Sequence, residues 1–383
     1  MKYKRTAAMP VGLLALATAV PLQASGITVY KGDNGEYVKI GGRIQIQYHR
    51  ADPDTGSTTD EVFFRRLRPY VEGSLHPDWK GRFQMDFGKA EDGNEVAIKD
   101  AYMQYKGYEN MKVTFGNANF PFSREFLTSS KYQQLVERTF VGDHDYGTPD
   151  RNMGLHLDGH NGDRKLTWAA SAASASIDPD NAKLDFDTPV NRNSDFNEGW
   201  IFGGRVDFHP LGYLKFSQGD FSGDTRATIG VAAFAWNNDD DNKTYAPGCT
   251  SKCDVDSVNA FEVSGAFRSH GFSVDAEYNR FDAELAEAGV TSGIYRNSET
   301  TLENWSVEGG YMVIPSKLEI VAAYQSQDAD NYVNEWNRTS LGANYFIEKH
   351  DIKLQATYTM NEDVDGVPGE DEDEFFLQAQ YVF

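Results

Sequence analysis

The chain has 383 residues, and its 58 acidic and 36 basic side chains give a formal net charge of −22. This excess of negative charge excludes the basic surface that holds nucleic acid, so no nucleic-acid partner is expected. Tyrosine and phenylalanine are abundant, with 20 and 24 copies, and short alternating segments outnumber helical stripes. This profile is typical of an outer-membrane β-barrel, although a large secreted β-sandwich or β-helix shares part of it.

The first 24 residues have the pattern of a secretory signal peptide. A positively charged start at residues 2–5 precedes an apolar core at residues 7–20, and small residues near Ala24 offer a cleavage site. We expect cleavage after Ala24, which leaves residues 25–383 as one exported barrel domain; an uncleaved anchor is the alternative.

Sixteen later segments alternate apolar and polar side chains over the length of a transmembrane strand. Such a strand needs about 9 to 11 residues, with apolar side chains facing lipid at every second position. In the first segment Ile40, Ile44 and Ile46 share one face, and Arg43 and Gln45 share the other. The segments are residues 38–48, 64–75, 79–87, 98–105, 111–116, 153–158, 166–174, 200–208, 227–236, 259–267, 272–281, 305–313, 318–324, 339–346, 352–358 and 375–383.

The connections between these segments differ in length. Short ones such as 76–78 and 269–271 alternate with long polar ones, as periplasmic turns alternate with extracellular loops in bacterial barrels. Residues 210–226 fit less well, because they form either a long periplasmic link or a further short strand near 213–216. Sixteen strands enclose a lumen that side chains cannot fill. The sequence therefore predicts an all-β, transmembrane, antiparallel barrel with an aqueous lumen.

The chain ends on an alternating segment, FFLQAQYVF, whose last residue is Phe383. This resembles the C-terminal strand of bacterial outer-membrane barrels, in which the terminal aromatic residue is part of the signal read by the barrel-assembly machinery. We therefore expect this machinery, outer-membrane lipid and lipopolysaccharide as partners. The expected location is the outer membrane of a Gram-negative bacterium.

The polar faces of the early segments carry cations. In FFRRLRPYVEGSL, Arg66 and Arg68 have inward parity, whereas Arg65 has outward parity near the extracellular end, where its long stem can reach the interface. Acidic residues of inward parity gather on the later segments, so the lumen is expected to be basic on one wall and acidic on the other. Alternatively, these charges only keep a wide pore wet and rigid. The inward cations are Arg43, Arg66, Arg68, Lys80, Arg82 and Arg205, and the later acids are Glu262, Asp275, Glu277, Glu308 and Glu319.

The longest early connection, residues 117–152, combines a helix-capping pattern at 128–130 with many apolar side chains. Its hydrophobic content argues against a loop that extends into water. We expect an inward-folded third extracellular loop that presents Arg124, Lys131, Arg138 and Arg151 to the pore.

Four stretches of this region, FFRRLRPYVEGSLHPDWKGRFQMDFG, IKDAYMQY, VTFGNANFPFSREFLTSSKYQQLVER and DRNMG, resemble consecutive motifs of the phosphate-selective porin O and P family. The resemblance implies a homotrimeric, sixteen-stranded porin for small anions such as phosphate, with arginines that feed anions to a constriction lined by lysine and arginine. The matching positions are the arginines of FRRLR, Lys131, Arg138 and Arg151.

Two alternatives stay open. Acidic loops at 237–242 and 361–374 would repel anions within a Debye length of roughly 8 Å, which favours a general, weakly cation-preferring porin. A plugged structural or adhesive barrel, or a barrel enzyme, is the second alternative.

Two clusters of side chains are candidate sites. Cys249 and Cys253 are the only cysteines, and a small loop disulfide is expected in an oxidising compartment, with free thiols or a metal site as alternatives. Asp143, His144 and Asp145 are adjacent, and adjacent residues in a loop rarely converge on one ion. We expect no metal, no cofactor and no catalytic residues, since nucleophile-elbow and phosphate-loop motifs are missing from the sequence.

Overall fold

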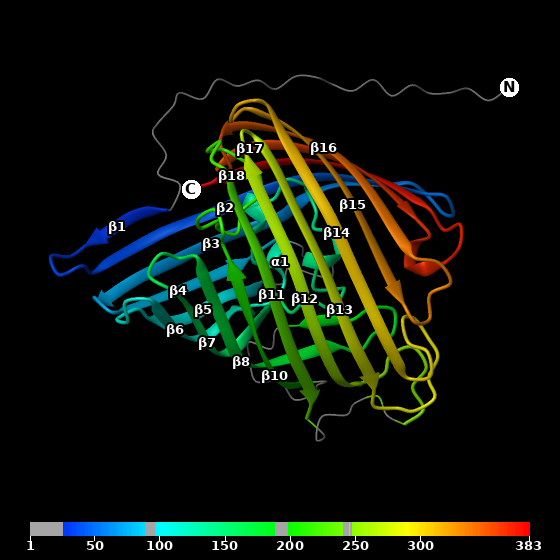
Figure 1. The fold of residues 1–383 in the computed structure, drawn as a ribbon. Coiled ribbons are helices and arrows are strands. Elements are labelled where there is room, and N and C mark those ends of the chain that lie inside the picture. The colour runs from blue at the N-terminus through cyan, green and yellow to red at the C-terminus, as the bar shows by residue number, and fades with distance from the viewer. Residues whose placement is uncertain (1–25, 89–95, 188–197, 240–244, 246) are drawn as a thin grey trace.

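The computed structural model describes residues 26–88, 96–187, 198–239, 245 and 247–383. The expected signal peptide lies outside these residues. Sixteen strands pair in sequence order, each antiparallel to its neighbours, and β18 pairs with β2 to close the barrel (Figure 1). The barrel strands are β2 (Tyr37–Pro53), β3 (Thr59–His76), β4 (Trp79–Asp86), β5 (Ala97–Tyr105), β6 (Met111–Asn119), β7 (Arg151–His160), β8 (Leu166–Asp178), β10 (Glu198–Phe208), β11 (Arg226–Asn238), β12 (Val255–Ser269), β13 (Phe272–Leu285), β14 (Glu299–Ile314), β15 (Leu318–Ala329), β16 (Trp336–Glu348), β17 (Ile352–Glu362) and β18 (Glu372–Val382).

Each of the sixteen predicted segments corresponds to one of these strands, which confirms the predicted barrel. Residues 209–225 contain no strand, so the connection between β10 and β11 is a long link rather than a further hairpin. Two short strands stand outside the barrel wall. β1 (Ile27–Lys31) pairs with β2 at the end where the C-terminus lies (Figure 1), and β9 (Asp185–Asp187) pairs antiparallel with the end of β8.

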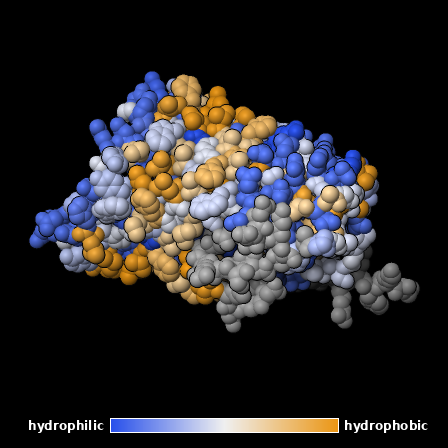
Figure 2. Space-filling model, turned by 90° about the horizontal axis from the view of Figure 1, so that it is seen from below, coloured by the Kyte–Doolittle hydropathy of each residue, from blue (hydrophilic) through white to orange (hydrophobic). Residues whose placement is uncertain are grey.

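Alternation along the strands decides which face each side chain occupies. On β2, Ile40 and Ile46 are 46% and 43% exposed, whereas Gln45 and Gln47 are buried. Figure 2 shows hydrophobic residues gathered between two more hydrophilic ends of the barrel. Apolar side chains outside and polar side chains inside suit a wall with lipid on one face and a polar lumen on the other.

Two β-bulges break this alternation in neighbouring parts of the wall. The β2–β3 register shifts so that Gln45 pairs with Arg66 and Ile46 pairs with Phe64, which leaves Arg65 as the extra residue. The β4–β5 register likewise skips Lys99. An extra residue in one strand reverses which of the following side chains point inward and which point outward. The outward parity predicted for Arg65 is therefore wrong, because the bulge turns its side chain to Glu137 in the connection between β6 and β7.

The connection between β6 and β7, residues 120–150, contacts strands on opposite sides of the barrel. It includes α1 (Arg124–Leu127), which Ser123 caps by accepting a hydrogen bond from the Phe126 N–H. No helix in the described part of the chain is long and apolar enough to cross a membrane. Hydrogen bonds join this connection to β2 through Arg43, to β13 through Asp275, to β15 through Glu319 and to β17 through Lys353.

Candidate functional site: a chain of three cavities

Three cavities follow one another between the long-loop end and the short-turn end of the barrel. The outer cavity has a volume of about 780 Å³ and is lined by Glu137, Arg338 and Glu374 among others. The middle cavity, of about 290 Å³, shares Arg65, Arg138 and Asp143 with it. The inner cavity, of about 520 Å³, shares Arg43, Asn119, Ser129 and Arg151 with the middle one. Shared lining residues make these cavities a candidate path through the barrel.

Cationic side chains dominate the middle cavity, and some of them are paired with carboxylates. The Arg65 Nε and Nη2 atoms donate to both oxygens of Glu137, at 2.7 and 2.8 Å. Arg68 Nε donates to Asp86 at 2.5 Å. Lys99 Nζ lies 3.0 Å from Asp150. These pairs hold the wall together and cancel part of its charge.

Three other guanidinium groups at this cavity, those of Arg43, Arg66 and Arg138, have no carboxylate within ion-pair distance among the described residues. Arg43 Nη1 donates to the hydroxyls of Ser130 at 2.5 Å and Ser129 at 3.2 Å. Arg66 Nη1 donates to the Gln45 side-chain oxygen at 3.1 Å. Arg138 Nη2 donates only to backbone carbonyls, of Phe126 and Thr128. The cavity therefore carries excess positive charge.

The remaining predicted cations lie away from the middle cavity. Arg82 lines the inner cavity and pairs with Asp100 at 2.8 Å, and Lys80 lies 3.4 Å from Glu72. Lys131 lines none of the three cavities. Its Nζ lies 4.7 Å from the centre of the Tyr132 ring. Burial, and then the charge of Arg43, lower the pKa of the Lys131 ammonium.

Arg124 and Arg205 pair with carboxylates of β10, β12 and β13 instead of lining the middle cavity, and Arg205 also lines the inner cavity. Arg124 Nε donates to Asp275 at 3.1 Å. Arg205 lies 2.9 Å from Glu262 and 2.8 Å from Asp207, with its side chain almost wholly buried. Both guanidinium groups therefore have carboxylate partners.

The acidic wall itself is covered. Glu277, Glu308 and Glu319 do point inward, as their parity predicts, but all three are buried. Glu277 accepts from the Glu125 N–H at 2.9 Å, and Glu319 accepts from the Gln134 side chain at 2.7 Å. The acids of one wall therefore face inward as expected but are covered by residues 120–150, which also contact Arg43 on the basic wall.

Burial and neighbouring charges shift the pKa values of two carboxyl groups within residues 120–150, those of Glu125 and Glu137. Burial alone would raise the pKa of Glu137, but the Arg65 guanidinium outweighs burial and lowers this pKa to about 2. Burial raises the pKa of Glu125 to about 7, even though Thr139 donates to its carboxylate through N–H and hydroxyl. The Glu137 carboxylate therefore keeps its charge at neutral pH, whereas the Glu125 carboxylate loses much of its charge as the pH falls just below neutrality.

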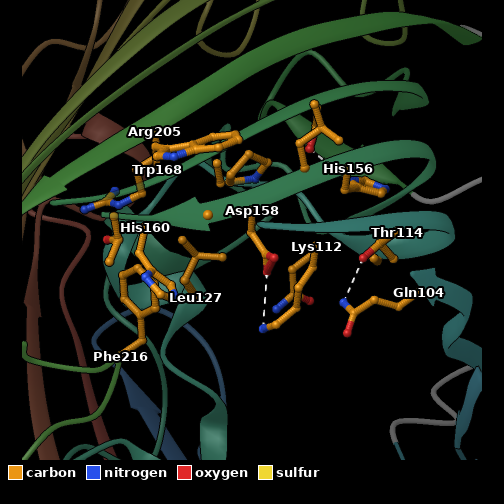
Figure 3. A pocket seen from close by; sticks show the side chains of 18 of the residues that line it. Gln104, Lys112, Thr114, Leu127, His156, Asp158, His160, Trp168, Arg205 and Phe216 are labelled. Carbon is orange, nitrogen blue, oxygen red and sulfur yellow. Dashed lines mark hydrogen bonds and ion pairs between the residues drawn. The ribbon is translucent and has the colours of Figure 1, made fainter. Parts of the chain in front are cut away.

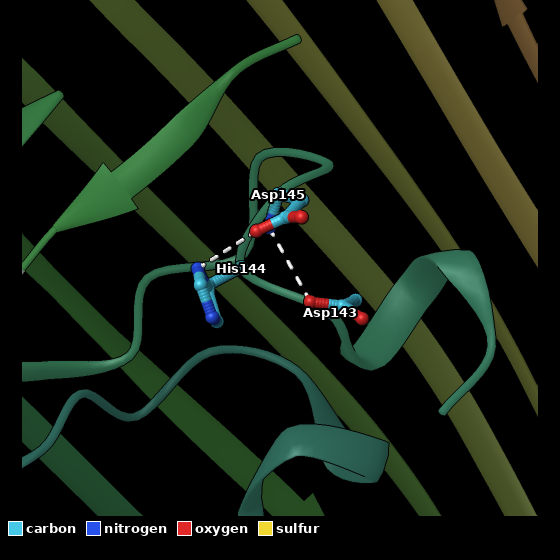
Figure 4. Close-up of side chains that lie close together, drawn as sticks. All are labelled: Asp143, His144 and Asp145. Atoms are coloured by element: carbon cyan, nitrogen blue, oxygen red, sulfur yellow. Dashed lines mark hydrogen bonds and ion pairs between the residues drawn. The ribbon is translucent and has the colours of Figure 1, made fainter. Parts of the chain in front are cut away.

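Asp143, His144 and Asp145 bring their ligand atoms within 4.8 Å of one another (Figure 4). His144 Nδ1 lies 2.8 Å from Asp185 and 3.1 Å from Asp145, and Lys183 Nζ lies 3.2 Å from Asp185. Burial lowers the pKa of His144, but the hydrogen bond to Asp185 and the nearby acids outweigh it and raise the pKa to about 9. The imidazole is thus a cation in an ion-pair network, and its Nδ1 is already engaged.

The two cysteines are bonded to each other, and two cations reach the middle cavity from bulged strands. Cys249 and Cys253 form a disulfide, with Cα atoms 5.4 Å apart. Arg65 and Lys99 line the middle cavity although alternation places neither there. Each stands next to another charged residue, Arg66 or Asp100, inside a strand. Two consecutive charged residues in a membrane strand indicate a β-bulge, because strict alternation would place one of the two charges in lipid.

A closed sixteen-stranded antiparallel barrel with a chain of polar cavities defines the porin class of outer-membrane channels. Residues 38–383 match the family described as phosphate-selective porin O and P, and the chain belongs to this family. It is an outer-membrane channel of a Gram-negative bacterium.

Individual relatives agree with this assignment. Porin O of Pseudomonas aeruginosa is 26% identical over 407 aligned positions, which cover 94% of this chain and 91% of that protein. Among solved structures, OmpF of Salmonella typhi in complex with daunomycin has a TM-score of 0.63 at 14% identity, covering 93% of this chain and all of that one. The anion-selective porin from Comamonas acidovorans has a TM-score of 0.60 at 11% identity, covering 91% of this chain and all of that one. At these identities the structures speak for the fold alone.

Proposed function

We propose that the channel conducts small inorganic anions, such as phosphate or related oxyanions, by passive diffusion. The observation that carries this proposal is the set of guanidinium groups at the middle cavity, on Arg43, Arg66 and Arg138, that lack a carboxylate partner among the described residues. The description of the matching family, phosphate-selective porin O and P, supports the same direction.

The arrangement suggests how an oxyanion would pass. Residues 120–150, folded into the lumen, would form the constriction, and their contacts with β2, β13, β15 and β17 support this role. An oxyanion that leaves its hydration shell can accept charge-assisted hydrogen bonds from neighbouring arginines. Conduction also requires binding weak enough for release. The hydroxyl and amide partners of Arg43 and Arg66 can be exchanged for the anion without breaking an ion pair.

Further assignments rest on the family and on sequence patterns. We infer cleavage of residues 1–24, assembly into homotrimers, surroundings of outer-membrane lipid and lipopolysaccharide, and delivery by the barrel-assembly machinery through Phe383. We also infer that the barrel is a channel without enzymatic activity. Gel mobility before and after boiling tests the trimer, and N-terminal sequencing of the purified protein tests the cleavage.

The test is block of single-channel chloride current by phosphate in planar bilayers. Arg43→Gln and Arg66→Gln should each weaken this block by about tenfold, the effect of one lost charge-assisted hydrogen bond. Arg280→Gln is the matched control, because Arg280 pairs with the exposed Asp282 and lines none of the three cavities. Phosphate block that persists unchanged in both cavity variants would contradict the proposal.

One observation favours a general, weakly cation-preferring porin. The outer cavity is lined by Glu61, Glu137, Asp143 and Glu374 together with its cations, and an acidic mouth attracts cations when salt is low. This alternative predicts cation preference in dilute potassium chloride that weakens as salt rises, together with indifference to phosphate.

A further inference from the structure

The link between β10 and β11, residues 209–225, is built into the interior of the barrel. The Gln218 N–H donates to the Tyr132 carbonyl at 3.1 Å, and the Gln218 side-chain oxygen accepts from the Gln134 N–H at 2.7 Å. The Phe221 ring lies 4.8 Å from the rings of both Phe346 and His350. The link is thus fixed against residues 120–150 and against β16, and its side chains face defined surroundings.

Before this anchored part, the link presents apolar side chains to the inner cavity. Tyr213, Leu214 and Phe216 all line that cavity, and Tyr213 is 41% exposed. Leu127, from the end of α1, lines it as well. Figure 3 shows Leu127, His160 and Phe216 gathered on one side of the cavity. An apolar surface is therefore assembled from two segments that are far apart in the sequence.

Cations line the same cavity. Arg43, Arg82 and Arg151 border it. Arg82 and Arg151 each pair with Asp100, which also lines the cavity, at 2.8 Å, whereas Arg43 has no carboxylate within ion-pair distance among the described residues. The volume of about 520 Å³ lies in the range of pockets that hold small organic ligands. A hydrated inorganic ion gains nothing from partly exposed leucine and phenylalanine side chains, because these offer it no hydrogen bonds.

We infer that the inner cavity is a binding site for organic phosphate monoesters with a small apolar body, such as an aryl phosphate. The phosphate group would accept hydrogen bonds from the guanidinium groups, and the body would cover Leu127, Leu214 and Phe216. This inference rests on the proposed anion channel and deepens it, since it names a substrate class in addition to inorganic oxyanions.

The test compares phenyl phosphate, methyl phosphate and inorganic phosphate as blockers of chloride current, each added from the short-turn side. Phenyl phosphate should block at about a tenfold lower concentration than methyl phosphate, through the extra apolar area that it buries. Leu214→Ser, and as a second variant Leu127→Ser, should reduce this preference to about threefold or less. Leu211→Ser is the matched control, because Leu211 belongs to the same link, is 48% exposed and does not line the cavity.

The outcomes separate this inference from the proposed function. Equal block by phenyl and methyl phosphate, with inorganic phosphate still active, overturns the organic site and leaves the anion channel standing. A phenyl preference that survives in both Leu214→Ser and Leu127→Ser also overturns the site. Block by phenyl phosphate but not by inorganic phosphate supports the site and contradicts the proposed phosphate channel. Failure of all three blockers overturns both.

Discussion

Replacing Glu137 by Gln should make the channel more anion-selective. Glu137 lies where the outer cavity meets Arg65, and its carboxylate accepts two hydrogen bonds from this arginine at 2.7 and 2.8 Å. Because its pKa is lowered to about 2, the carboxylate carries its full charge at neutral pH. The amide of Gln removes that charge but can still accept one hydrogen bond from Arg65.

The size of the effect follows from Coulomb's law. In water, a unit charge about 8 Å from a passing ion changes the energy of that ion by about 0.5 kcal/mol. A Debye length of about 10 Å at 0.1 M salt roughly halves this value. Glu137→Gln should therefore raise the anion-to-cation permeability ratio by about 1.5- to 2-fold, and Arg65→Gln should lower it by a similar factor.

The assay is the zero-current potential of each variant under a salt gradient, with gel mobility before and after boiling as a check on barrel folding. Asp282→Asn is the matched control, because Asp282 pairs with Arg280 at 2.9 Å and is exposed outside the three cavities. Shifts of the same sign in Glu137→Gln and Arg65→Gln would refute the electrostatic reasoning, since displacement of residues 120–150 affects both alike.

Three further predictions concern single groups. Lys131→Glu should shift the zero-current potential toward cations through its charge beside Arg43; an unchanged potential would remove Lys131 from the selectivity determinants. The pKa of His144 is raised to about 9. The stabilisation of the folded loop by its ion pairs with Asp185 and Asp145 is therefore complete below pH 6.5, the ordinary pKa of histidine, and is lost as the pH rises through 9. Amide hydrogen exchange at residues 143–147, corrected for its intrinsic pH dependence, should therefore become faster between pH 8 and 10. The Asp185→Asn variant, which keeps Asp143, Asp145 and Lys183, should not show this increase. Cys249 and Cys253 should resist alkylation until reduced, and ready alkylation without reductant would exclude the disulfide.

The sequence predicted the barrel because lipid enforces alternation along each strand. Ile40, Ile44 and Ile46 are outward for the same reason that Arg43 and Gln45 are inward, and this pattern repeats through β18. The connection at 209–225 could not be assigned in advance, since its anchors are Tyr132 and Gln134 on another segment.

The site was predicted less completely, for two physical reasons. A β-bulge reverses which face a side chain occupies and leaves no mark in the composition, so the strict alternation that placed Arg65 outward fails at that point. Burial of Glu277 and Glu319 depends on where residues 120–150 lie, and alternation carries no information about that position. The distinction between paired arginines, such as Arg205, and those without carboxylate partners likewise needed three-dimensional distances.

The most direct test of the central claim is the zero-current potential of the purified channel under a potassium chloride gradient, repeated with added phosphate. If the arginines of the middle cavity set the selectivity, the potential reports anion preference and millimolar phosphate blocks the chloride current. A cation-selective potential that is indifferent to phosphate would contradict the account and assign selectivity to the acidic outer cavity.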